Sequence, residues 1–177
     1  MTSAFSPDAV LAAPGPLLQI HLGADGLPAR ASAAARLRAP PARVWAVISD
    51  VDGYAGRVPM IHRVRKDGDR VTVSLRFKVA LFSVGFAFVA DVRPDPERSL
   101  EIRGVSGEPR GIVLRFDLAP LSGGAETLVE TTAELDVLSL GWLPKYFLGH
   151  HPEIQHGILP GVALALLDSM RRAAEPR

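Results

Sequence analysis

Alternating hydrophobic and polar residues characterise the middle of the chain, from residue 60 to residue 138. In the clearest run, Arg70–Lys78, every second residue is apolar and the residues between them are charged or hydroxylated. Side chains alternate between the two faces of a strand, so this period predicts strands with one apolar face. Turn-forming residues separate the runs and define expected strands over residues 60–66, 70–78, 84–92, 99–105, 111–118 and 126–138.

Elements of other kinds flank this region. Residues 31–39 predict a further strand and residues 17–22 can form a short one, whereas the prolines at positions 40 and 41 are typical of a helix start. Residues 50–59, which contain glycines and a proline, are expected to form a second short helix or a loop. Residues 160–174 carry an apolar helical stripe, and residues 153–159 can add one or two turns before a kink at 157–160.

A sheet with one apolar face needs a cover, and the C-terminal helix is the obvious one. The expected fold class is therefore α+β, with a curved antiparallel sheet of about six to seven strands wrapped around a long C-terminal helix. A length of 177 residues argues for a single domain, predicted over residues 17–177. The small, proline-containing residues 1–16 are expected to be a flexible leader.

Composition and charge exclude several classes of function. Hydrophobic residues make up 47% and charged residues 22% of the chain, as in ordinary soluble globular proteins. A formal net charge of +1 gives no overall attraction to nucleic acid, so no nucleic-acid partner is expected. The absence of cysteine excludes disulfides, thiolate metal sites and a cysteine nucleophile. Because no apolar run is long enough to span a membrane, we expect a cytoplasmic protein.

One local motif resembles a known superfamily. Residues 39–50 read A-P-P-A-R-V-W-A-V-I-S-D and are followed by Tyr54 and by Val58-Pro59. This run is similar to the A-P-x-x-x-V-W-x-x-x-x-D motif, with an aromatic residue and V-P after it, found in many START-like (Bet v 1-like, SRPBCC) proteins. The superfamily includes lipid-transfer domains, coenzyme Q-binding proteins and polyketide cyclases. With the strand count and the last helix, the resemblance covers roughly residues 30–175.

The resemblance implies a helix-grip fold, with two short helices after the first strand and a cavity between the sheet and the last helix. In this superfamily the cavity holds an apolar or amphipathic small molecule. The residues expected to contact such a ligand are His62, Phe77, Phe86, Phe88, Ile102, Leu114, Phe116, Thr131, Val162, Leu166 and Met170. The alternative is that the apolar members simply fill a solid core.

Polar residues on the expected inner face are the candidates for chemistry. His62 is predicted to share a strand face with Met60 and Val64, where it can bind a ligand hydroxyl or act as an acid or base. Thr131 can hydrogen-bond a ligand head group, although threonine is common in strands for structural reasons. If the protein is an enzyme, His62 and Tyr146 are the candidate catalytic residues.

The only cluster of histidines lies ahead of the last helix, at His150, His151 and His156, with Glu153 beside them. Metal sites use histidine and carboxylate ligands, but a proline at position 152 interrupts the helical phase and the adjacent histidines point in different directions. We expect no metal and no cofactor. The cluster is interpreted as the start of the last helix or part of a lid.

Two apolar segments are predicted to be loops. One covers residues 79–84, has neither a charge nor a clear turn residue, and includes Leu81 and Phe82; the other covers residues 141–148 and includes Trp142, Leu143, Tyr146 and Phe147. The resemblance places both loops at the cavity mouth. They can form a lid that touches a membrane or a donor protein, or they can fold over the core and close it.

The sequence therefore predicts a protein that binds, and can transfer, an apolar small molecule such as a lipid, sterol, quinone or polyketide. Catalysis is less expected than binding, since no nucleophile elbow, phosphate-binding loop or dinucleotide fingerprint is present. Two alternatives stay open. One is a polyketide cyclase or aromatase that uses the same cavity, and the other is a protein-interaction module that docks through Phe82 and Trp142.

Overall fold

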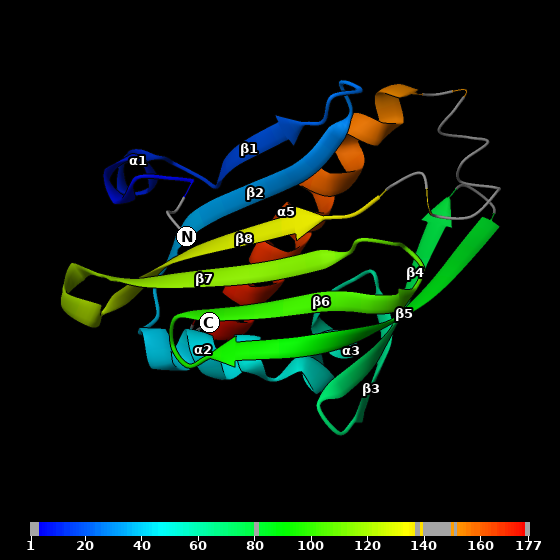
Figure 1. Cartoon of the computed structure of the whole chain (residues 1–177). Helices are drawn as coiled ribbons and strands as arrows, with labels where there is room; N and C mark the ends of the chain where they lie inside the picture. The colour runs from blue at the N-terminus through cyan, green and yellow to red at the C-terminus, as the bar shows by residue number, and fades with distance from the viewer. Residues whose placement is uncertain (1–3, 80–81, 137–138, 140–149, 151, 176–177) are drawn as a thin grey trace.

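An eight-stranded antiparallel sheet curves around one long helix in the computed structural model of the chain (Figure 1). The structure describes residues 4–79, 82–136, 139, 150 and 152–175. The strands are β1 (Leu17–Leu22), β2 (Pro28–Leu37), β3 (Ile61–Asp67), β4 (Arg70–Val79), β5 (Phe82–Asp95), β6 (Ser99–Gly107), β7 (Val113–Leu121) and β8 (Glu126–Glu134). Their order across the sheet is β1-β2-β8-β7-β6-β5-β4-β3.

Helices lie before β1, after β8 and in the connection between β2 and β3, and a 3-10 turn connects β7 to β8. They are α1 (Pro7–Ala12), α2 (Pro41–Ser49), the 3-10 turn η1 (Val51–Gly53), α3 (Tyr54–Arg57), the 3-10 turn η2 (Ser122–Gly124) and α5 (Pro152–Ala174). This arrangement confirms the predicted α+β helix-grip fold, including two short helices after β2. The two expected parts of the last helix form a single helix with Pro160 inside it.

The core lies between the inner face of the sheet and α5. The register places Ala33 opposite Thr131, Thr131 opposite Phe116, and Phe116 opposite Leu100, so these four residues form one row across four strands. All four are at most 1% exposed. Because paired residues share a face, the whole row faces inward. The alternation seen in the sequence thus becomes one continuous apolar surface beneath α5.

Two hydrogen bonds fix how α5 lies over the sheet. The Thr131 hydroxyl donates to the main-chain oxygen of Ala163 at 2.9 Å, and the main-chain N–H of Arg38 donates to the Glu175 carboxylate at 3.0 Å. The helix advances about 18 Å between Ala163 and Glu175. The strand advances about 17 Å between Ala33, beside Thr131, and Arg38. α5 therefore runs along β2, in the same direction.

Two expectations about strands need correction. The sheet has eight strands rather than six or seven, because residues 17–22 do form a strand, β1. The predicted loop over residues 79–84 is also mostly strand, since Val79 pairs with Phe82 and only residues 80–81 separate β4 from β5. An apolar run without a charge or a turn residue can also continue a strand. The prediction of a loop was therefore wrong for residues 79 and 82–84.

The predicted leader contains structure as well. Ser6 caps α1 by accepting a hydrogen bond from the Ala9 N–H at 3.1 Å. Val10 of α1 is 4% exposed and belongs to a second apolar cluster with Ala34, Leu121 and Leu128, on the face of the sheet opposite α5. A helix of six residues gives little periodic signal, so the sequence did not indicate it. The domain boundary after residue 16 stays a prediction.

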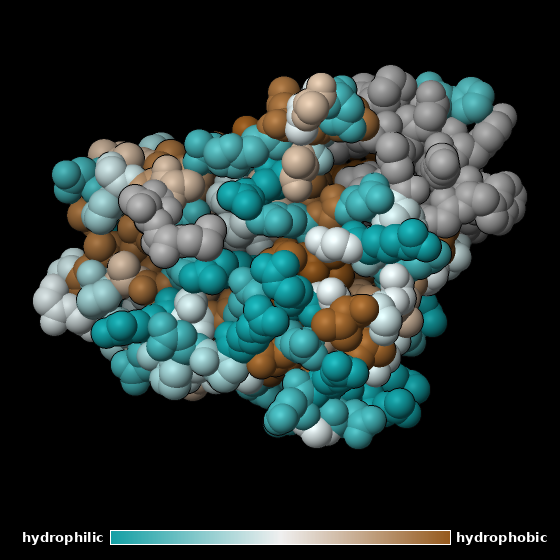
Figure 2. Space-filling view, in the orientation of Figure 1, coloured by the Kyte–Doolittle hydropathy of each residue, from teal (hydrophilic) through white to brown (hydrophobic). Residues whose placement is uncertain are grey.

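The outer face of the sheet is rich in charged and hydroxyl side chains (Figure 2). Glu101 is the centre of an ion-pair network on this face, with Arg103 at 2.9 Å, Arg93 at 3.5 Å and Arg115 at 3.6 Å. The hydrogen bond from Arg103 lowers the pKa of the Glu101 carboxyl, and the nearby charges of the three arginines lower it further. No described helix is long and apolar enough to cross a membrane.

Replacing Glu101 with glutamine is expected to reduce the free energy of unfolding by about 1 kcal/mol at neutral pH, since the ion pairs are only partly buried. The folded-state pKa of Glu101 lies below the unfolded-state value. Its contribution is therefore complete above the ordinary glutamate pKa of about 4.3 and is lost as the pH falls through the folded-state pKa. Urea unfolding of the wild type and the variant between acid and neutral pH measures this difference.

A matched control is Glu126→Gln, because the ion pair of Glu126 with Arg36 is long, 3.9 Å, and its other described contact is a hydrogen bond from the neutral Ser122 hydroxyl at 2.9 Å. We expect a smaller loss for this variant. A Glu101→Gln effect that stays constant over the whole pH range would contradict an ionic origin.

Candidate functional site

The candidate site is the apolar interface between the sheet and α5. Seven of the residues predicted to contact a ligand are buried there in the main apolar cluster: Val162, at 8% exposure, and six others, Phe88, Ile102, Leu114, Phe116, Leu166 and Met170. The six are the more deeply buried. Each is at most 5% exposed, so in this structure they fill the interface and offer almost no free surface. Their inward orientation agrees with the sequence pattern. Their role as ligand contacts stays a prediction.

Tyr54, the aromatic residue of the sequence motif, anchors this core. Its hydroxyl donates to the main-chain oxygen of Ile48 at 2.6 Å, and its ring contacts Phe116 edge-on, with 6.2 Å between the ring centroids. Burial raises the pKa of the Tyr54 hydroxyl far above its usual range. A neutral phenol held in this way joins α2 and α3 to the sheet, and it is not available as a proton donor to a ligand.

The interface is less tightly closed toward the end where α5 begins. Phe86, Leu135 and Ile158 are only partly buried there, although each packs against the main cluster. Leu75, which pairs with Phe86, and Val162 on α5 each retain 8% exposure. Of these five residues, Phe86 and Val162 were predicted from the sequence to be ligand contacts, whereas Leu75, Leu135 and Ile158 were not. The alternation did indicate an inward Leu75, but no pattern marks which inward residues lie near an opening.

Sheet register explains why this end differs. β5 pairs with β6 only from Phe88 onward, so residues 82–87 pair with β4 alone and extend beyond the rest of the sheet (Figure 1). β6 ends at Gly107, whose φ of +94° suits glycine, and the main-chain N–H of Glu108 makes a last hydrogen bond to β5, to the Ala87 oxygen at 3.0 Å. The β4–β5 ribbon, the end of β8 and the start of α5 all lie at this end, because α5 runs along β2 and antiparallel to β8.

The predicted loop residues fall partly outside the described residues. Leu81, Trp142, Leu143, Tyr146 and Phe147 lie there. Phe82 is described by its backbone, which belongs to β5 and pairs with Val79. Phe77 belongs to β4 and pairs with Val84, but its side chain is outside the description. β8 and α5, which flank residues 141–148, end and begin at the same end of the sheet as the β4–β5 ribbon.

His62 does not face the interior. β3 is irregular at this point: Ile61 pairs with Leu75 and Arg63 with Ser74, so His62 is the extra residue of a bulge and its side chain is exposed. The prediction that His62 shares a face with Val64 is wrong, because the bulge shifts the alternation by one residue. Ile61 is the residue of this strand that enters the core, at 4% exposure.

Thr131 does point inward, as predicted, but its hydroxyl is already engaged. It donates to the main-chain oxygen of Ala163 at 2.9 Å, and the oxygen of Ala33, at 3.3 Å, is a second acceptor for the same proton. Thr127, in the same strand, donates to the main-chain oxygen of Ala39 at 2.7 Å. A hydroxyl carries a single proton, so Thr131 links α5 to the sheet and has no second donor for a ligand head group.

No group of three or more histidine, aspartate or glutamate side chains is placed to hold a metal ion among the described residues. Of the histidine cluster, the structure describes the exposed side chains of His150 and His156, whereas His151 and the side chain of Glu153 lie outside it. The described part of the interior is therefore mainly apolar, and the buried hydroxyls of Tyr54, Thr127, Thr131 and Ser169 all donate to main-chain oxygens. Such a surface can bind an apolar molecule by burial.

A family model described as "Polyketide cyclase / dehydrase and lipid transport" matches residues 28–159, about three quarters of the chain. The chain belongs to this family. The match confirms the resemblance seen in the motif at residues 39–59. It begins with β2 and ends within α5, so α1 and β1 precede the part of the chain that the family model covers.

Solved structures share the fold at low sequence identity. The Zhui aromatase/cyclase from a Streptomyces species aligns with a TM-score of 0.61 at 18% identity, over 82% of this chain and 92% of that chain. A START superfamily protein from Mycobacterium smegmatis aligns with a TM-score of 0.57 at 15% identity, over 82% of this chain and 96% of that chain. These identities show a common fold and nothing finer. No curated protein matches the sequence.

Replacing Thr131 with valine, which keeps the shape of the side chain, is expected to lower the free energy of unfolding by about 1–3 kcal/mol. The reason is that the Ala163 and Ala33 oxygens lose a buried donor. Thr72→Val is the matched control, because Thr72 is half-buried in β4 and the structure records no hydrogen bond for its hydroxyl. Urea unfolding of both variants measures the difference, and equal losses would show that the hydroxyl of Thr131 does not link α5 to the sheet.

Proposed function

We propose that the protein binds an apolar small molecule between the sheet and α5, and that this ligand enters from the end where α5 begins. One observation carries this proposal: burial of the inward apolar residues decreases from complete at Phe116 and Met170 to partial at Phe86 and Ile158. A ligand that inserts at this end covers apolar surface that the protein leaves partly open. Burial of such surface contributes about 25 cal/mol of binding free energy per Å². Membership of a family described by lipid transport and polyketide cyclisation supports the same chemistry.

The ligand class that fits is a lipid, sterol, quinone or polyketide, because the described lining offers apolar contacts and no charged group. The β4–β5 ribbon stands beside the proposed opening, and it is the part of the described chain best placed to touch a membrane or a donor protein during transfer. A cytoplasmic location is part of the same proposal. Binding of the ligand itself requires neither the contact with a membrane or donor protein nor the cytoplasmic location.

Binding is favoured over catalysis by the described residues. A cyclase needs an acid or base beside the ligand. The side chain of His62, however, is exposed to solvent at the bulge, and the hydroxyl of Tyr54 donates its proton to the main-chain oxygen of Ile48. Tyr146, the other candidate, lies outside the described residues. No observation on the described surface favours the alternative of a protein-interaction module that docks through Phe82 and Trp142.

Val162→Phe is expected to weaken binding of a neutral apolar probe at least fivefold, because the larger ring occupies the partly open end of the interface. The probe is Nile red, whose fluorescence rises in an apolar site, titrated into the full chain. Gly161→Phe is the matched control: Gly161 is adjacent on α5, exposed, and surrounded by open space where a side chain would project. It is expected to change the affinity less than twofold.

Ile158→Phe provides a second test at a less buried position of the same helix, in case Val162→Phe unfolds the protein. Equal binding by both folded variants and the wild type would overturn the proposed site. Mass spectrometry of bound material from the wild type, before and after incubation, separates binding from turnover. A ligand recovered chemically changed would favour the cyclase alternative.

A further inference from the structure

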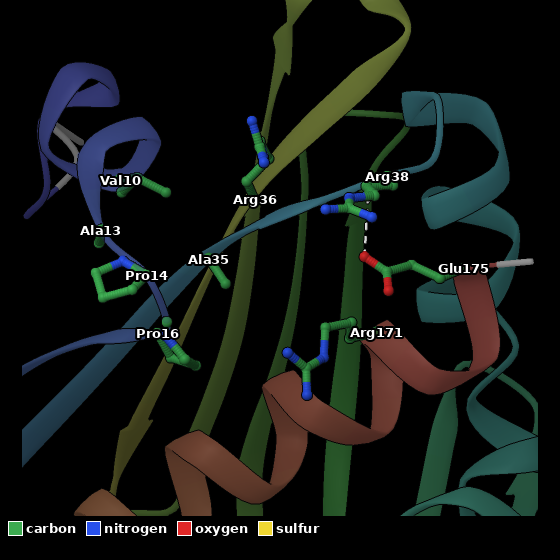
Figure 3. Close-up of a pocket in the computed structure, with 10 residues that line it drawn as sticks. Val10, Ala13, Pro14, Pro16, Ala35, Arg36, Arg38, Arg171 and Glu175 are labelled. Carbon is green, nitrogen blue, oxygen red and sulfur yellow. Dashed lines mark hydrogen bonds between the residues drawn. The ribbon is translucent and has the colours of Figure 1, made fainter.

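The residues that precede the family match help to build a second concave surface, outside the sheet–helix interior. The connection between α1 and β1, residues 13–16, lies across β2 from the last turns of α5. A pocket of about 200 Å³ opens between them, with Ala35 of β2 at its base (Figure 3). This pocket is distinct from the proposed interior site, which lies toward the opposite end of α5.

Two guanidinium groups reach this pocket. The Arg171 side chain extends from α5 toward Pro16 (Figure 3), and it donates to Asp168 at 2.7 Å, a bond that uses one of its five N–H donors. Arg38 lies at the end of β2, and its main-chain N–H holds the Glu175 carboxylate. Within the described residues, no ion pair joins the guanidinium of Arg38 to a carboxylate.

The charge of the pocket is positive. Glu175 is the one acidic residue among its described lining residues, against three arginines. The third arginine, Arg36, extends away from Arg171 (Figure 3) and approaches Glu126 at 3.9 Å. Arg38 has no ion pair within the described residues, and Arg171 shares Asp168 with Arg172 and keeps N–H donors beyond the one it gives to that carboxylate, so these two side chains can bind an anion. Paired guanidinium groups favour carboxylate and phosphate, whose oxygens accept several N–H donors at once.

An apolar strip on β1 continues from this pocket. Leu18 pairs with Ala33 and Ile20 pairs with Ala31, and both alanines face α5 with no exposed surface. Leu18 and Ile20 share that face, yet they are 42% and 40% exposed, because α5 lies mainly over β2 and β8 and covers β1 only in part. The strip begins two residues after Pro16, which lines the pocket.

We propose that the pocket binds the head group of an anionic amphiphile, a carboxylate or phosphate carried on an apolar chain that lies along Leu18 and Ile20. The charge of Arg38 and Arg171 complements the head group, and the exposed strip supplies contacts for the chain. The distance along β1 from Pro16 to Ile20 is about 13 Å. An alkyl chain of medium length on the head group therefore reaches both Leu18 and Ile20. This site does not depend on the proposed interior site.

Dodecyl phosphate is the probe for this site, titrated into the full chain by calorimetry below its micelle concentration. Arg171→Gln and Arg38→Gln are each expected to raise the dissociation constant at least fivefold. Arg172→Gln is the matched control, because Arg172 is the next residue, pairs with the same Asp168 at 2.6 Å and does not line the pocket. It is expected to change the dissociation constant less than twofold.

Two further arms separate the head group from the chain. Leu18→Ser combined with Ile20→Ser is expected to weaken binding of dodecyl phosphate and to leave binding of inorganic phosphate unchanged. Nile red binding is expected to be the same in Arg171→Gln as in the wild type, which keeps this test independent of the interior site. Thermal unfolding of each variant confirms that it is folded.

Three results would overturn the proposal. The first is an equal loss of affinity in the Arg171 and Arg172 variants, which would indicate general attraction to a basic helix end. The second is loss of dodecyl phosphate binding in Val162→Phe, which would place the amphiphile in the interior. The third is wild-type protein that binds neither dodecyl phosphate nor inorganic phosphate.

Discussion

Burial of one face of the sheet against α5 is the interaction on which the other features depend. Seven strands, β2 to β8, supply inward apolar residues, and a single helix covers them while running along β2. Thr131 contributes the one described side-chain hydrogen bond that joins this helix to the central strands. Because one helix cannot cover eight strands, the cover is complete in the middle and incomplete toward β1 and toward the β4–β5 ribbon. Both proposed binding sites lie where the cover is incomplete.

Most of the fold could be predicted from the sequence, because the alternation of residues 70–78 and 126–134 is an intrinsic property of the chain. The register across strands could not. His62 shows the difference: its sequence neighbours indicated an inward side chain, and one extra residue in the pairing of β3 with β4 placed it in solvent. Pairing is decided by a partner strand that lies elsewhere in the sequence, so a local pattern does not reveal a bulge.

The candidate site was harder to predict than the fold. Orientation was correct for Phe88, Phe116 and Met170, since inward residues follow from the period of each element. Accessibility was not predictable, because it depends on how far α5 reaches and on where β6 leaves β5. Thr131 illustrates the same limit for polar residues. The sequence indicates a buried hydroxyl, whereas only the structure shows that this hydroxyl already donates its proton to main-chain oxygen.

The bulge at His62 has a consequence for the protein's behaviour at high concentration. β3 is an outermost strand of the sheet, and such strands can recruit the edge of another molecule and start aggregation. The extra residue interrupts the regular spacing of main-chain donors and acceptors, and Arg63, Arg65 and Lys66 beside it add positive charge. Two copies approaching along this border meet mismatched hydrogen-bonding groups and like charges, which discourages the formation of a continuous intermolecular sheet.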